Sequence, residues 1–312
     1  MTVGQQDDVI VVGGGVIGLT TAVVLAERGR GVRLWTRDAA ERTTSAVAGA
    51  LWWPYRIEPA DAVHGWALRS LTVFEELAAG GAESGVRMVE GVLGATDPDE
   101  VRGWAGDRLA VRPYEGGGTW ARLPLIDMRA HLGWLGRRLV AAGGTVEERS
   151  VSPGFPEADA RVVVNCTGLA ARELVPDPAV RPVRGQLVVV ANPGLETWMV
   201  AADDGGAAKT YFFPHGDRLL LGGTAEDDVW STAPDPAVAA AIVRRCAALR
   251  PEIAGARVLE HRVGLRPARD AVRLGPQRLP DGRLLVHNYG HGGAGVTVAW
   301  GCAEEAARWC EG

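Results

Sequence analysis

The fold of this chain is decided by the stretch Val9-Ile10-Val11-Val12-Gly13-Gly14-Gly15-Val16-Ile17-Gly18. Its first four residues form a continuous β-branched run, which predicts a short parallel strand covered on both faces. The first, third and last glycines have the spacing of a dinucleotide-binding turn. They allow a tight turn, a close approach of the backbone to a pyrophosphate, and packing of a helix against the strand. A helix expected over 19–28 would direct its positive N-terminus at those phosphates.

The residues that follow complete a β-turn-α-β unit. Residues 32–35 predict a second strand, and the polar pair Arg37-Asp38 stands just after it. Asp38 is suited to bind the ribose hydroxyls of an adenosine, whereas Arg37 is equally suited to the extra phosphate of NADP. The motif therefore predicts a dinucleotide site and leaves open whether the dinucleotide is FAD or a nicotinamide cofactor.

Composition narrows the class of protein. The 312 residues are 47% hydrophobic, which suffices for a large core or two lobes, and the formal net charge is −5. The chain has neither the basic stripe of a nucleic-acid binder nor the run of about 20 apolar residues that spans a membrane. The N-terminus lacks the features of a secretory signal, so we expect a cytoplasmic protein. Four scattered cysteines without a CxxC pair or a histidine cluster support no metal site and no redox dithiol.

The periodicity of the remaining sequence predicts an α/β protein whose N-terminal motif is completed by the C-terminus. Helices are expected over 67–78, 127–142, 236–249 and 296–309, and strands over 161–165, 183–190, 211–214, 219–223 and 284–288. The strands between 183 and 223 read as antiparallel members of a second sheet. Because a glycine loop and a helix follow the last strand, we expect one domain assembled from both ends, with the second sheet inserted.

Two further segments have the composition of anion or ring-binding loops. The first runs Thr43-Thr44-Ser45 and then Gly49-Ala50-Leu51, and its hydroxyls and small residues suit a pyrophosphate or a flavin edge as well as they suit an ordinary polar loop. The second is a glycine-rich loop that opens a helix, which favours an anion for the same reason as the N-terminal turn. It includes Gly292, Gly293, Gly295, Val296 and Thr297, and we expect its His291 to be structural.

Arg266 and Tyr211 are the candidates for substrate binding. Arg266 has apolar residues before it and a proline after it, so its guanidinium needs an anionic partner. A substrate carboxylate held bidentately fits this need, and so does a structural salt bridge. Tyr211 begins the run Tyr211-Phe212-Phe213-Pro214, where its hydroxyl is placed to reach the same carboxylate or its ring simply fills the core.

Taken together, these motifs resemble those of the D-amino acid oxidases, which are related to the D-aspartate oxidases. The matches run in order from Val9 to Arg308. They include the GGGVIGL opening, 47–55, 164–168, 184–186, Tyr211-Phe-Phe-Pro, 221–223, the segment 263–267, 287–293 and 300–303. The resemblance implies a Rossmann-like FAD-binding domain with an inserted antiparallel-sheet substrate domain, an α+β unit. The FAD-binding domain would comprise 1–55, 126–182 and 260–312, and the substrate domain 56–125 and 183–259.

The resemblance also implies the roles of individual residues. Arg266 would bind the substrate carboxylate beside the Tyr211 hydroxyl, and the Gly293 carbonyl would accept a hydrogen bond from the amine. The cofactor residues it implies are Gly13, Gly14, Gly15, Val16, Ile17, Gly18, Arg37, Asp38, Thr43, Thr44, Ser45, Gly49, Ala50, Leu51, Val151, Thr167, Gly168, Arg266, Gly292, Gly293, Gly295, Val296 and Thr297.

The implied reaction is oxidative deamination. The Cα hydrogen leaves as hydride to flavin N5 while the neutral amine supplies its lone pair, so no general base is needed at Cα. Hydrolysis of the imino acid gives a 2-oxo acid and ammonia, and O₂ reoxidises the flavin to give hydrogen peroxide. Many relatives are dimers, although no segment of this sequence marks an interface.

Three departures from the family pattern refine this expectation. Position 207, where animal members carry a lid tyrosine, is Ala207 within a Gly- and Ala-rich stretch, so we expect a short or absent lid. D-aspartate oxidases hold a second carboxylate with an arginine and a histidine at the positions of Ala225 and Tyr55. Acidic residues at 226–228 follow here, which favours neutral or basic substrate side chains. The C-terminus lacks a peroxisomal Ser-Lys-Leu address.

Three other functions remain as alternatives. A glycine or sarcosine oxidase and a D-aspartate oxidase would share the cofactor and the hydride transfer but differ in substrate. A non-catalytic NADP-binding sensor is the third, because Arg37 and the first glycine turn alone do not exclude it.

Overall fold

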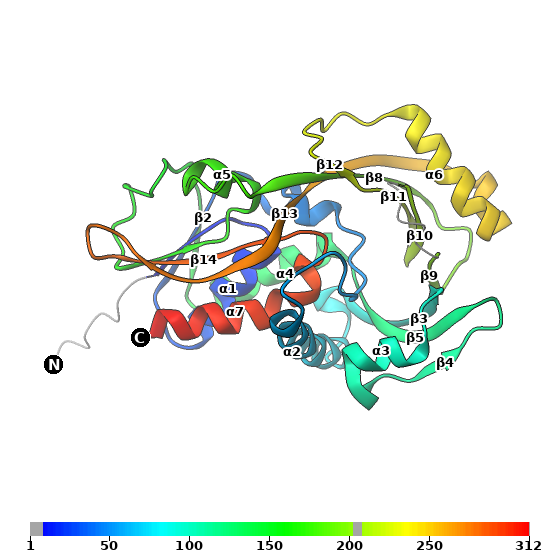
Figure 1. The fold of residues 1–312 in the computed structure, drawn as a ribbon, viewed down its shortest axis with the longest axis horizontal. Helices are drawn as coiled ribbons and strands as arrows, with labels where there is room; N and C mark the ends of the chain where they lie inside the picture. The colour runs from blue at the N-terminus through cyan, green and yellow to red at the C-terminus, as the bar shows by residue number, and fades with distance from the viewer. Residues whose placement is uncertain (1–8, 202–207, 312) are drawn as a thin grey trace.

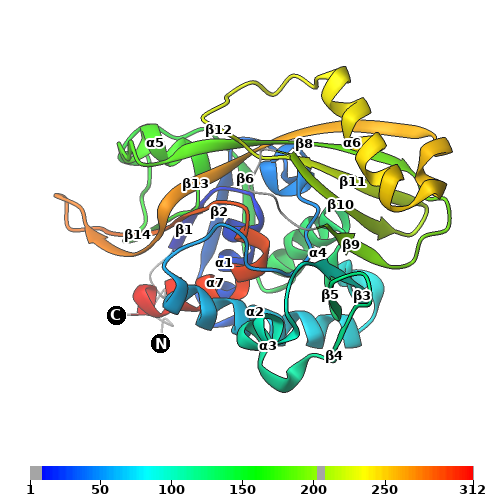
Figure 2. The ribbon, with the colours of Figure 1, turned by 45° about the vertical axis from the view of Figure 1, so that its right-hand side comes forward.

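The structure of the chain, a computed structural model, describes residues 9–201 and 208–311. Its strands form one continuous sheet in the order β4-β5-β3-β9-β10-β11-β8-β13-β14-β7-β1-β2-β6, with β12 paired to β8. Helices cover both ends of this sheet (Figures 1 and 2). The mixed α/β class predicted from the sequence is confirmed.

The N-terminal motif lies in a parallel half of the sheet. This half comprises β1 (Val9–Val12), β2 (Val32–Thr36), β6 (Thr145–Glu148), β7 (Val162–Asn165) and β14 (Leu284–His291). Val9 and Val11 pack with the helices on one face, whereas Ile10 and Val12 pack with Phe155 on the other. Burial on both faces accounts for the uninterrupted apolar run of β1.

Three helices pack together against the parallel half. They are α1 (Val16–Glu27), α4 (Met128–Ala141) and α7 (Gly295–Glu311). Both α1 and α7 begin directly after a glycine loop, and they lie side by side beneath the sheet (Figures 1 and 2). The N-terminal and C-terminal glycine loops are thereby brought into one half of the molecule, as the sequence predicted.

The other half, called the antiparallel half because all but one of its described strand pairs are antiparallel, extends the same sheet. Its strands are β3 (Val86–Gly94), β4 (Val111–Pro113), β5 (Gly118–Ile126), β8 (Arg181–Ala191), β9 (Trp198–Val200), β10 (Ala208–His215), β11 (Arg218–Thr224) and β12 (Glu226–Asp227). Helix α6 (Pro236–Leu249) covers β8, β10 and β11 through a separate core that includes Phe212, Leu221 and Ile242. Helix α2 (Ala60–Ala79) packs on α7 and β3, with α3 (Pro98–Ala105) beside it.

The two halves are joined by β13 (Val258–Arg278), a 21-residue strand that pairs with β8 on one side and β14 on the other. The strands that the sequence assigned to a second sheet are therefore a continuation of the first. The remaining elements are α5 (Ala171–Leu174) and the 3₁₀ helices η1 (Ala40–Arg42), η2 (Thr44–Val47), η3 (Ala82–Ser84), η4 (Gly106–Arg108), η5 (Gly168–Ala170) and η6 (Pro251–Gly255).

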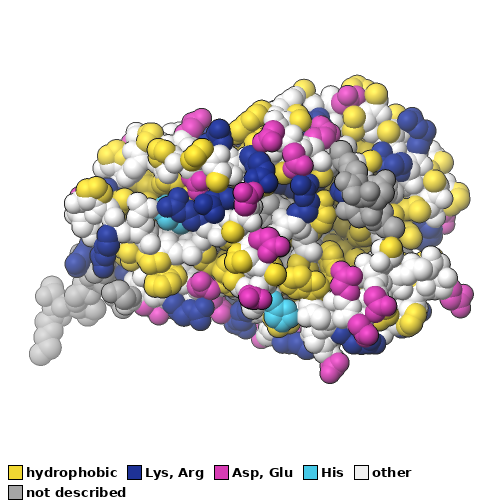
Figure 3. All heavy atoms as spheres, viewed as in Figure 1, with side chains coloured by type: hydrophobic (Ala, Val, Ile, Leu, Met, Phe, Trp, Pro, Cys, Tyr) yellow, Lys and Arg dark blue, Asp and Glu magenta, His cyan; other side chains and the backbone are white. Residues whose placement is uncertain are grey.

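Charged side chains of both signs are intermingled over the face seen in Figure 3. None of the described helices combines the length and apolar character that crossing a membrane requires. All four cysteines lie among the described residues, where they are buried and unpaired. Within the same residues, no group of three or more His, Cys, Asp or Glu side chains is placed to hold a metal ion.

Candidate cofactor and substrate site

The first glycine turn leaves no room for side chains. Gly13 has a φ of +119°, and a Cβ there would collide with the carbonyl oxygen of Cys166. A Cβ at Gly18 would collide with the Gly13 carbonyl, and one at Gly14 with the Thr36 side chain. Gly15 is the N-cap of α1, so Val16 and Ile17 begin the helix with their N–H groups directed out of its end. This cradle is the geometry that a pyrophosphate requires.

The three neighbouring hydroxyls have different partners. Ser45 Oγ accepts a hydrogen bond of 2.9 Å from the N–H of Val16, which places it at the N-terminus of α1. Thr43 Oγ1 donates to the Ala40 carbonyl in its own turn, and Thr44 Oγ1 donates to the Leu265 carbonyl of β13. Of these three side chains, Ser45 is the one built into the anion cradle, while Thr44 ties the loop to the strand that carries Arg266.

The adenosine end of the predicted cofactor site lies at the carboxyl ends of the parallel strands. Arg37 and Asp38 follow β2 and form an ion pair with each other at 2.8 Å. This contact does not distinguish a site for the adenosine ribose from a site for the extra phosphate of NADP. Val151, three residues after the end of β6, packs against the hydrophobic cluster that includes Trp35. After β7, the backbone N–H and the hydroxyl of Thr167 both donate to Asn165 Oδ1, and Gly168 has a φ of +58°.

The second glycine loop precedes α7 and presents free backbone groups. Gly292 has a φ of +54°, and its N–H donates to the Pro267 carbonyl beside Arg266. The Gly293 carbonyl accepts no hydrogen bond from any described residue, which leaves it available to a ligand. Gly295 and Val296 form the first turn of α7, whose N–H groups point out of the helix.

Thr297 faces the protein rather than the loop. Its hydroxyl accepts from the Trp53 N–H at 3.3 Å and donates to the Trp53 carbonyl at 3.0 Å, and the residue is 2% exposed. The predicted contact of Thr297 with the cofactor stays a prediction.

Arg266 lies in β13 at the junction of the two halves. Its Nη1 donates to the Thr224 carbonyl at 3.1 Å, and both Nη atoms lie within 2.5 Å of the place a Cβ on Gly185 would occupy. No acidic side chain in 9–201 or 208–311 forms an ion pair with it. The structural salt bridge considered from the sequence is thus not formed with any described residue, and most of the guanidinium donors remain free for an anion.

Tyr211 stands beside this guanidinium. Its ring stacks on Phe213 at a centroid distance of 4.7 Å and crosses Gly222, where a Cβ would collide with it. Gly49 makes room on the other side, since a Cβ there would lie 2.7 Å from Phe213. Burial raises the pKa of the Tyr211 hydroxyl, although Arg266 opposes this shift. The hydroxyl is therefore protonated and can donate to a carboxylate.

Tyr55, to which the sequence assigned no role in the site, completes it. The Tyr55 ring packs against Gly293, where a Cβ would lie 2.7 Å from Tyr55 Cδ1. The Tyr55 hydroxyl is buried without a hydrogen-bond partner among the described residues, and it interacts electrostatically with Tyr211 and Arg56. An unpaired buried hydroxyl costs free energy unless a ligand satisfies it. The one sequence signal for Tyr55 was its position, where D-aspartate oxidases carry a histidine that holds a second carboxylate.

Ala50 and Leu51 remain predicted cofactor contacts, and both have backbone partners within the protein. Ala50 has a φ of +58° and its carbonyl accepts from the Ile126 N–H, while Leu51 forms a β-bridge with Leu125. His291 is buried, and burial lowers its pKa to about 3, so its imidazole is neutral. Ala207, the position of the expected lid, lies outside the described residues.

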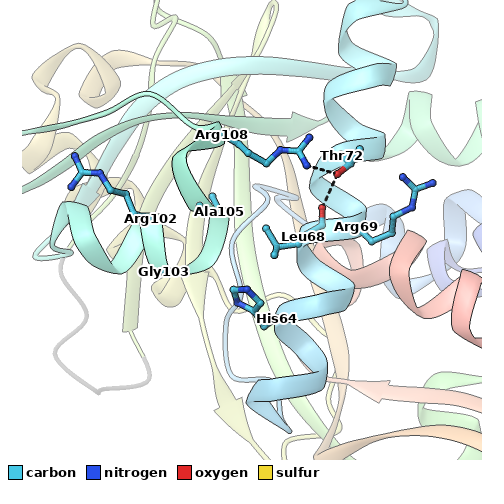
Figure 4. Close-up of a pocket in the computed structure, with 9 residues that line it drawn as sticks. His64, Leu68, Arg69, Thr72, Arg102, Gly103, Ala105 and Arg108 are labelled. Atoms are coloured by element: carbon cyan, nitrogen blue, oxygen red, sulfur yellow. Dashed lines mark hydrogen bonds between the residues drawn. The ribbon is translucent and has the colours of Figure 1, made fainter.

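A depression on the surface lies away from these residues. It has a volume of about 340 Å³ and is lined by residues of α2, α3 and η4, which include His64, Arg69 and Arg108 (Figure 4). Arg69 pairs with Glu304, and Arg108 pairs with Glu75 and donates to Thr72. Because these cations are already neutralised, the depression lacks the free donors found around Arg266.

The residues present fit a flavin dinucleotide. The collisions that side chains would cause at Gly13 and Gly18 define a pyrophosphate cradle on α1, to which Ser45 adds a hydroxyl. The second helix N-terminus, on α7, lies beside the free Gly293 carbonyl and the Tyr55 ring. A partial positive charge at such a helix end stabilises negative charge on a reduced ring.

Comparisons with known proteins agree with this arrangement. The sequence model of the FAD dependent oxidoreductase family matches residues 8–309. The chain is 73% identical over 310 residues to a D-amino-acid oxidase from Streptomyces coelicolor, with 97% of both chains covered. It is 52% identical to a D-amino-acid oxidase from Rubrobacter xylanophilus, covering 96% of this chain and 94% of that one. It is also 34% identical to the D-aspartate oxidase of Homo sapiens, over 96% of this chain and 93% of the relative.

Solved structures share the fold. The glycine oxidase from Geobacillus kaustophilus superposes with a TM-score of 0.81 at 22% identity, covering 98% of this chain and 95% of that one. The family match spans nearly all of the chain, and the resemblance inferred from the motifs is confirmed. The chain belongs to the D-amino-acid oxidase family of FAD-dependent oxidoreductases.

Proposed function

We propose that this chain is a D-amino-acid oxidase, which converts a D-amino acid to a 2-oxo acid, ammonia and hydrogen peroxide. The observation that carries the proposal is the pairing of a guanidinium without an acidic partner, Arg266, with a protonated phenol, Tyr211, on a strand whose next residue, Pro267, bonds to the loop with the free Gly293 carbonyl. This set offers a cation and a hydroxyl donor to a carboxylate and an acceptor to an amine. The names of the relatives that are 73% and 52% identical support the same reaction.

In this proposal, the side chains position the substrate and perform no proton transfer at Cα. Arg266 binds the carboxylate with two N–H groups, and Tyr211 donates its hydroxyl proton to the same group. The Gly293 carbonyl accepts a hydrogen bond from the amine and fixes the direction of its lone pair. When bound, FAD supplies the hydride acceptor. Fixed orientation of this kind accounts for several kcal/mol of a barrier without a catalytic base.

The Tyr55 hydroxyl belongs to the same proposal. Animal members of the family supply a second tyrosine from a lid, and this chain has Ala207 at that position. The buried and unpartnered hydroxyl of Tyr55 lies near Tyr211 and supports a role as the replacement donor. We assign it to the substrate carboxylate or to an ordered water between the carboxylate and the ring.

Further parts of the proposal concern the whole protein. We assign 1–55, 126–182 and 260–312 to FAD binding and 56–125 and 183–259 to the substrate, with β13 shared by both. Molecular oxygen as the electron acceptor is supported by the word oxidase in the names of the relatives. We also propose a cytoplasmic homodimer, which chromatography and fractionation of cells would test.

The decisive experiment is a visible spectrum of the purified holoenzyme before and after anaerobic addition of D-alanine. We expect the absorbance of oxidised flavin to bleach with D-alanine and to persist with L-alanine. Peroxide release from D-alanine, D-valine, D-lysine, glycine and sarcosine then defines the substrate class. Turnover of glycine or sarcosine alone would replace the proposal with a glycine-type oxidase. A colourless protein whose melting temperature rises with NADP would replace it with a nucleotide sensor.

A further inference from the structure

An ion pair connects the two halves of the molecule at the edge of the substrate site. Arg56 Nη2 lies 3.1 Å from Asp227 Oδ1 and 3.2 Å from Asp227 Oδ2. Arg56 belongs to the loop after Trp53, and Asp227 belongs to β12 in the antiparallel half. About half of each side chain is exposed, at 45% and 50%, so the pair is at the rim rather than inside.

Both partners are attached to residues of the proposed site. Arg56 directly follows Tyr55, whose ring packs against Gly293, and its carbonyl oxygen lies 2.9 Å from the place of a Cβ on Gly292. Asp227 comes three residues after Thr224, whose carbonyl accepts the hydrogen bond from Arg266. The rim pair is therefore adjacent both to the loop that holds the amine and to the strand end that orients the carboxylate ligand.

The backbone at Arg56 indicates that its position is imposed. Arg56 has a φ of +48°, which is uncommon for a residue with a side chain and costs free energy. The tight approach to Gly292, which itself has a φ of +54°, leaves the loop little room to relax. The backbone at Arg56 is therefore constrained, and the contact with Asp227 holds the guanidinium at the rim.

Two of the three acidic side chains at this edge are paired, whereas Asp228 forms no ion pair with a described residue. Glu226 accepts two hydrogen bonds from Arg184, whose side chain is 5% exposed. Asp227 is therefore neutralised by Arg56 and Glu226 by Arg184. The acidic run at 226–228, which the sequence argument treated as repulsive to an acidic substrate, faces a cation that this argument did not count.

We propose that the Arg56–Asp227 pair determines which side-chain charge the enzyme accepts. The inference rests on the proposed function, because it concerns the tail of the same D-amino acid. While the two charges neutralise each other, the rim favours uncharged side chains. Removal of Arg56 exposes a carboxylate that attracts a cationic tail, and removal of Asp227 exposes a guanidinium that attracts an anionic tail.

The size of the effect follows from the partial exposure of the rim. A unit charge on a substrate tail near one unpaired rim charge gains roughly 1 kcal/mol in such a solvated setting, or about five-fold in kcat/KM. Salt screens this attraction, so the preference has to shrink between about 0.05 M and 0.5 M ionic strength. A steric effect of the substitution would not depend on salt.

The test uses three substrates and four variants of the holoenzyme. The quantity measured is kcat/KM for D-lysine and for D-glutamate, each divided by kcat/KM for D-alanine. We expect Arg56→Gln to raise the D-lysine ratio roughly five-fold and Asp227→Asn to raise the D-glutamate ratio by a similar factor. The exchanged variant Arg56→Asp with Asp227→Arg restores the wild-type ratios. Arg69→Gln, which breaks an exposed pair with Glu304 far from the site, leaves both ratios unchanged.

Several results would overturn the inference. Ratios that stay constant in both single variants would remove the pair from specificity, and so would ratios that move in the same direction. If a single variant fails to fold, the exchanged variant decides, because its ratios must match the wild type. The proposed function is judged separately by the wild-type enzyme, since failure of D-alanine to bleach the wild-type flavin counts against that function rather than against the rim.

Discussion

At the scale of single residues, the site depends on a cation that the protein leaves unsatisfied. Arg266 donates one hydrogen bond to the Thr224 carbonyl and makes no ion pair within the described residues. A half-buried guanidinium without an anionic partner is unfavourable. Binding of a substrate carboxylate supplies that partner and therefore removes this cost. This is the reason we expect the carboxylate, rather than the substrate side chain, to dominate binding.

Replacing Arg266 by alanine tests this expectation. We expect the substitution to weaken substrate binding by about 2–5 kcal/mol, because the carboxylate would enter the pocket without its counter-charge. Flavin content and the thermal midpoint should change little, since the side chain forms no ion pair with a described residue and has polar contacts only with the Thr224 carbonyl and the Tyr211 hydroxyl among them. Anaerobic titration with D-alanine measures the dissociation constant, and a value within two-fold of wild type would exclude Arg266 from the site.

A second substitution disturbs the same guanidinium without touching its charge. A Cβ at Gly185 would lie 2.5 Å from both Nη atoms of Arg266, so Gly185→Ala must push the guanidinium aside. We expect KM for D-alanine to rise at least ten-fold while the flavin stays bound, since a displacement of this size misaligns a bidentate contact. Gly65→Ala is the matched control, because a Cβ there meets no atom within 4 Å. Equal effects of the two variants would contradict the argument.

The Tyr55 hydroxyl gives a third residue-scale prediction. Tyr55→Phe keeps the ring against Gly293 and deletes an oxygen that has no partner among the described residues. If the hydroxyl served the fold alone, its loss would leave activity unchanged and would stabilise the protein slightly. We expect instead that kcat/KM for D-alanine falls roughly ten-fold, by the order of 1.4 kcal/mol, while thermal stability is retained. Steady-state kinetics and a melting curve of the same preparation decide between these outcomes.

At the scale of secondary structure, three hydroxyls that look equivalent in the sequence have separate roles. Only Ser45 contacts the N-terminus of α1, through Val16, whereas Thr43 bonds within its own turn. We therefore expect Ser45→Ala to weaken FAD binding by about 1 kcal/mol, or roughly five-fold in Kd. Thr43→Ala should change Kd less than two-fold. Fluorescence titration of the apoprotein measures both, and equal losses would show that the loop acts as a whole.

The sequence predicted those elements whose periodicity is set by simple burial. The run 9–12 is buried on both faces and was predicted as a strand with its observed bounds, and the helix over 236–249 was predicted with the bounds of α6. Helix α1 begins at Val16, three residues before the prediction, because the glycine at position 18 was counted in the turn although it lies in the helix. Local chemistry thus located the elements better than it located their ends.

The strand β13 escaped prediction for a physical reason. Its 21 residues include arginines, two prolines and two glycines, and they lack the alternation of a half-buried strand. What holds β13 extended is pairing on both edges, with β8 and with β14, and this pairing is formed by residues distant in sequence. For the same reason, the free state of Arg266 and the Arg56–Asp227 pair had no sequence signal. The motifs identified the family and the ligand groups, but the partners came from tertiary structure.

At the scale of the whole molecule, β13 makes the cofactor half and the substrate half parts of one sheet. Arg266 lies on this shared strand, and the Thr44 hydroxyl and the Gly292 N–H bond to its flanking carbonyls, those of Leu265 and Pro267. Three consecutive residues, 265–267, therefore contact the 43–45 segment, carry the arginine proposed to bind the substrate carboxylate, and contact the second glycine loop. Because β13 is paired with strands of both halves, the cofactor site and the substrate site are held in a fixed relative position without a hinge between separate sheets.

Histidines buried in the interior make the stability of the whole molecule sensitive to acid. Burial lowers the pKa of His131, His215 and His287 to about 4, and that of His291 to about 3. An unfolded chain has histidines that titrate near 6.5, so it binds protons that the folded chain excludes. The stability contributed by these neutral imidazoles is therefore complete above about pH 6.5 and is lost as the pH falls through 4.

His131 offers the sharpest test of this linkage because it is fully buried, between Phe74 and Trp134. Because the pKa of His131 is lowered, this residue alone should decrease the free energy of unfolding by about 2 kcal/mol when the pH falls from 7.5 to 5. His131→Phe preserves the stacked aromatic volume and loses the hydrogen bond to the Ser84 carbonyl, so its stability at neutral pH falls. Its loss between the two pH values should nevertheless be smaller than that of the wild type by about 2 kcal/mol. Urea denaturation of the FAD-saturated proteins at both pH values measures this difference, and parallel pH profiles would show that His131 does not resist protonation in the fold.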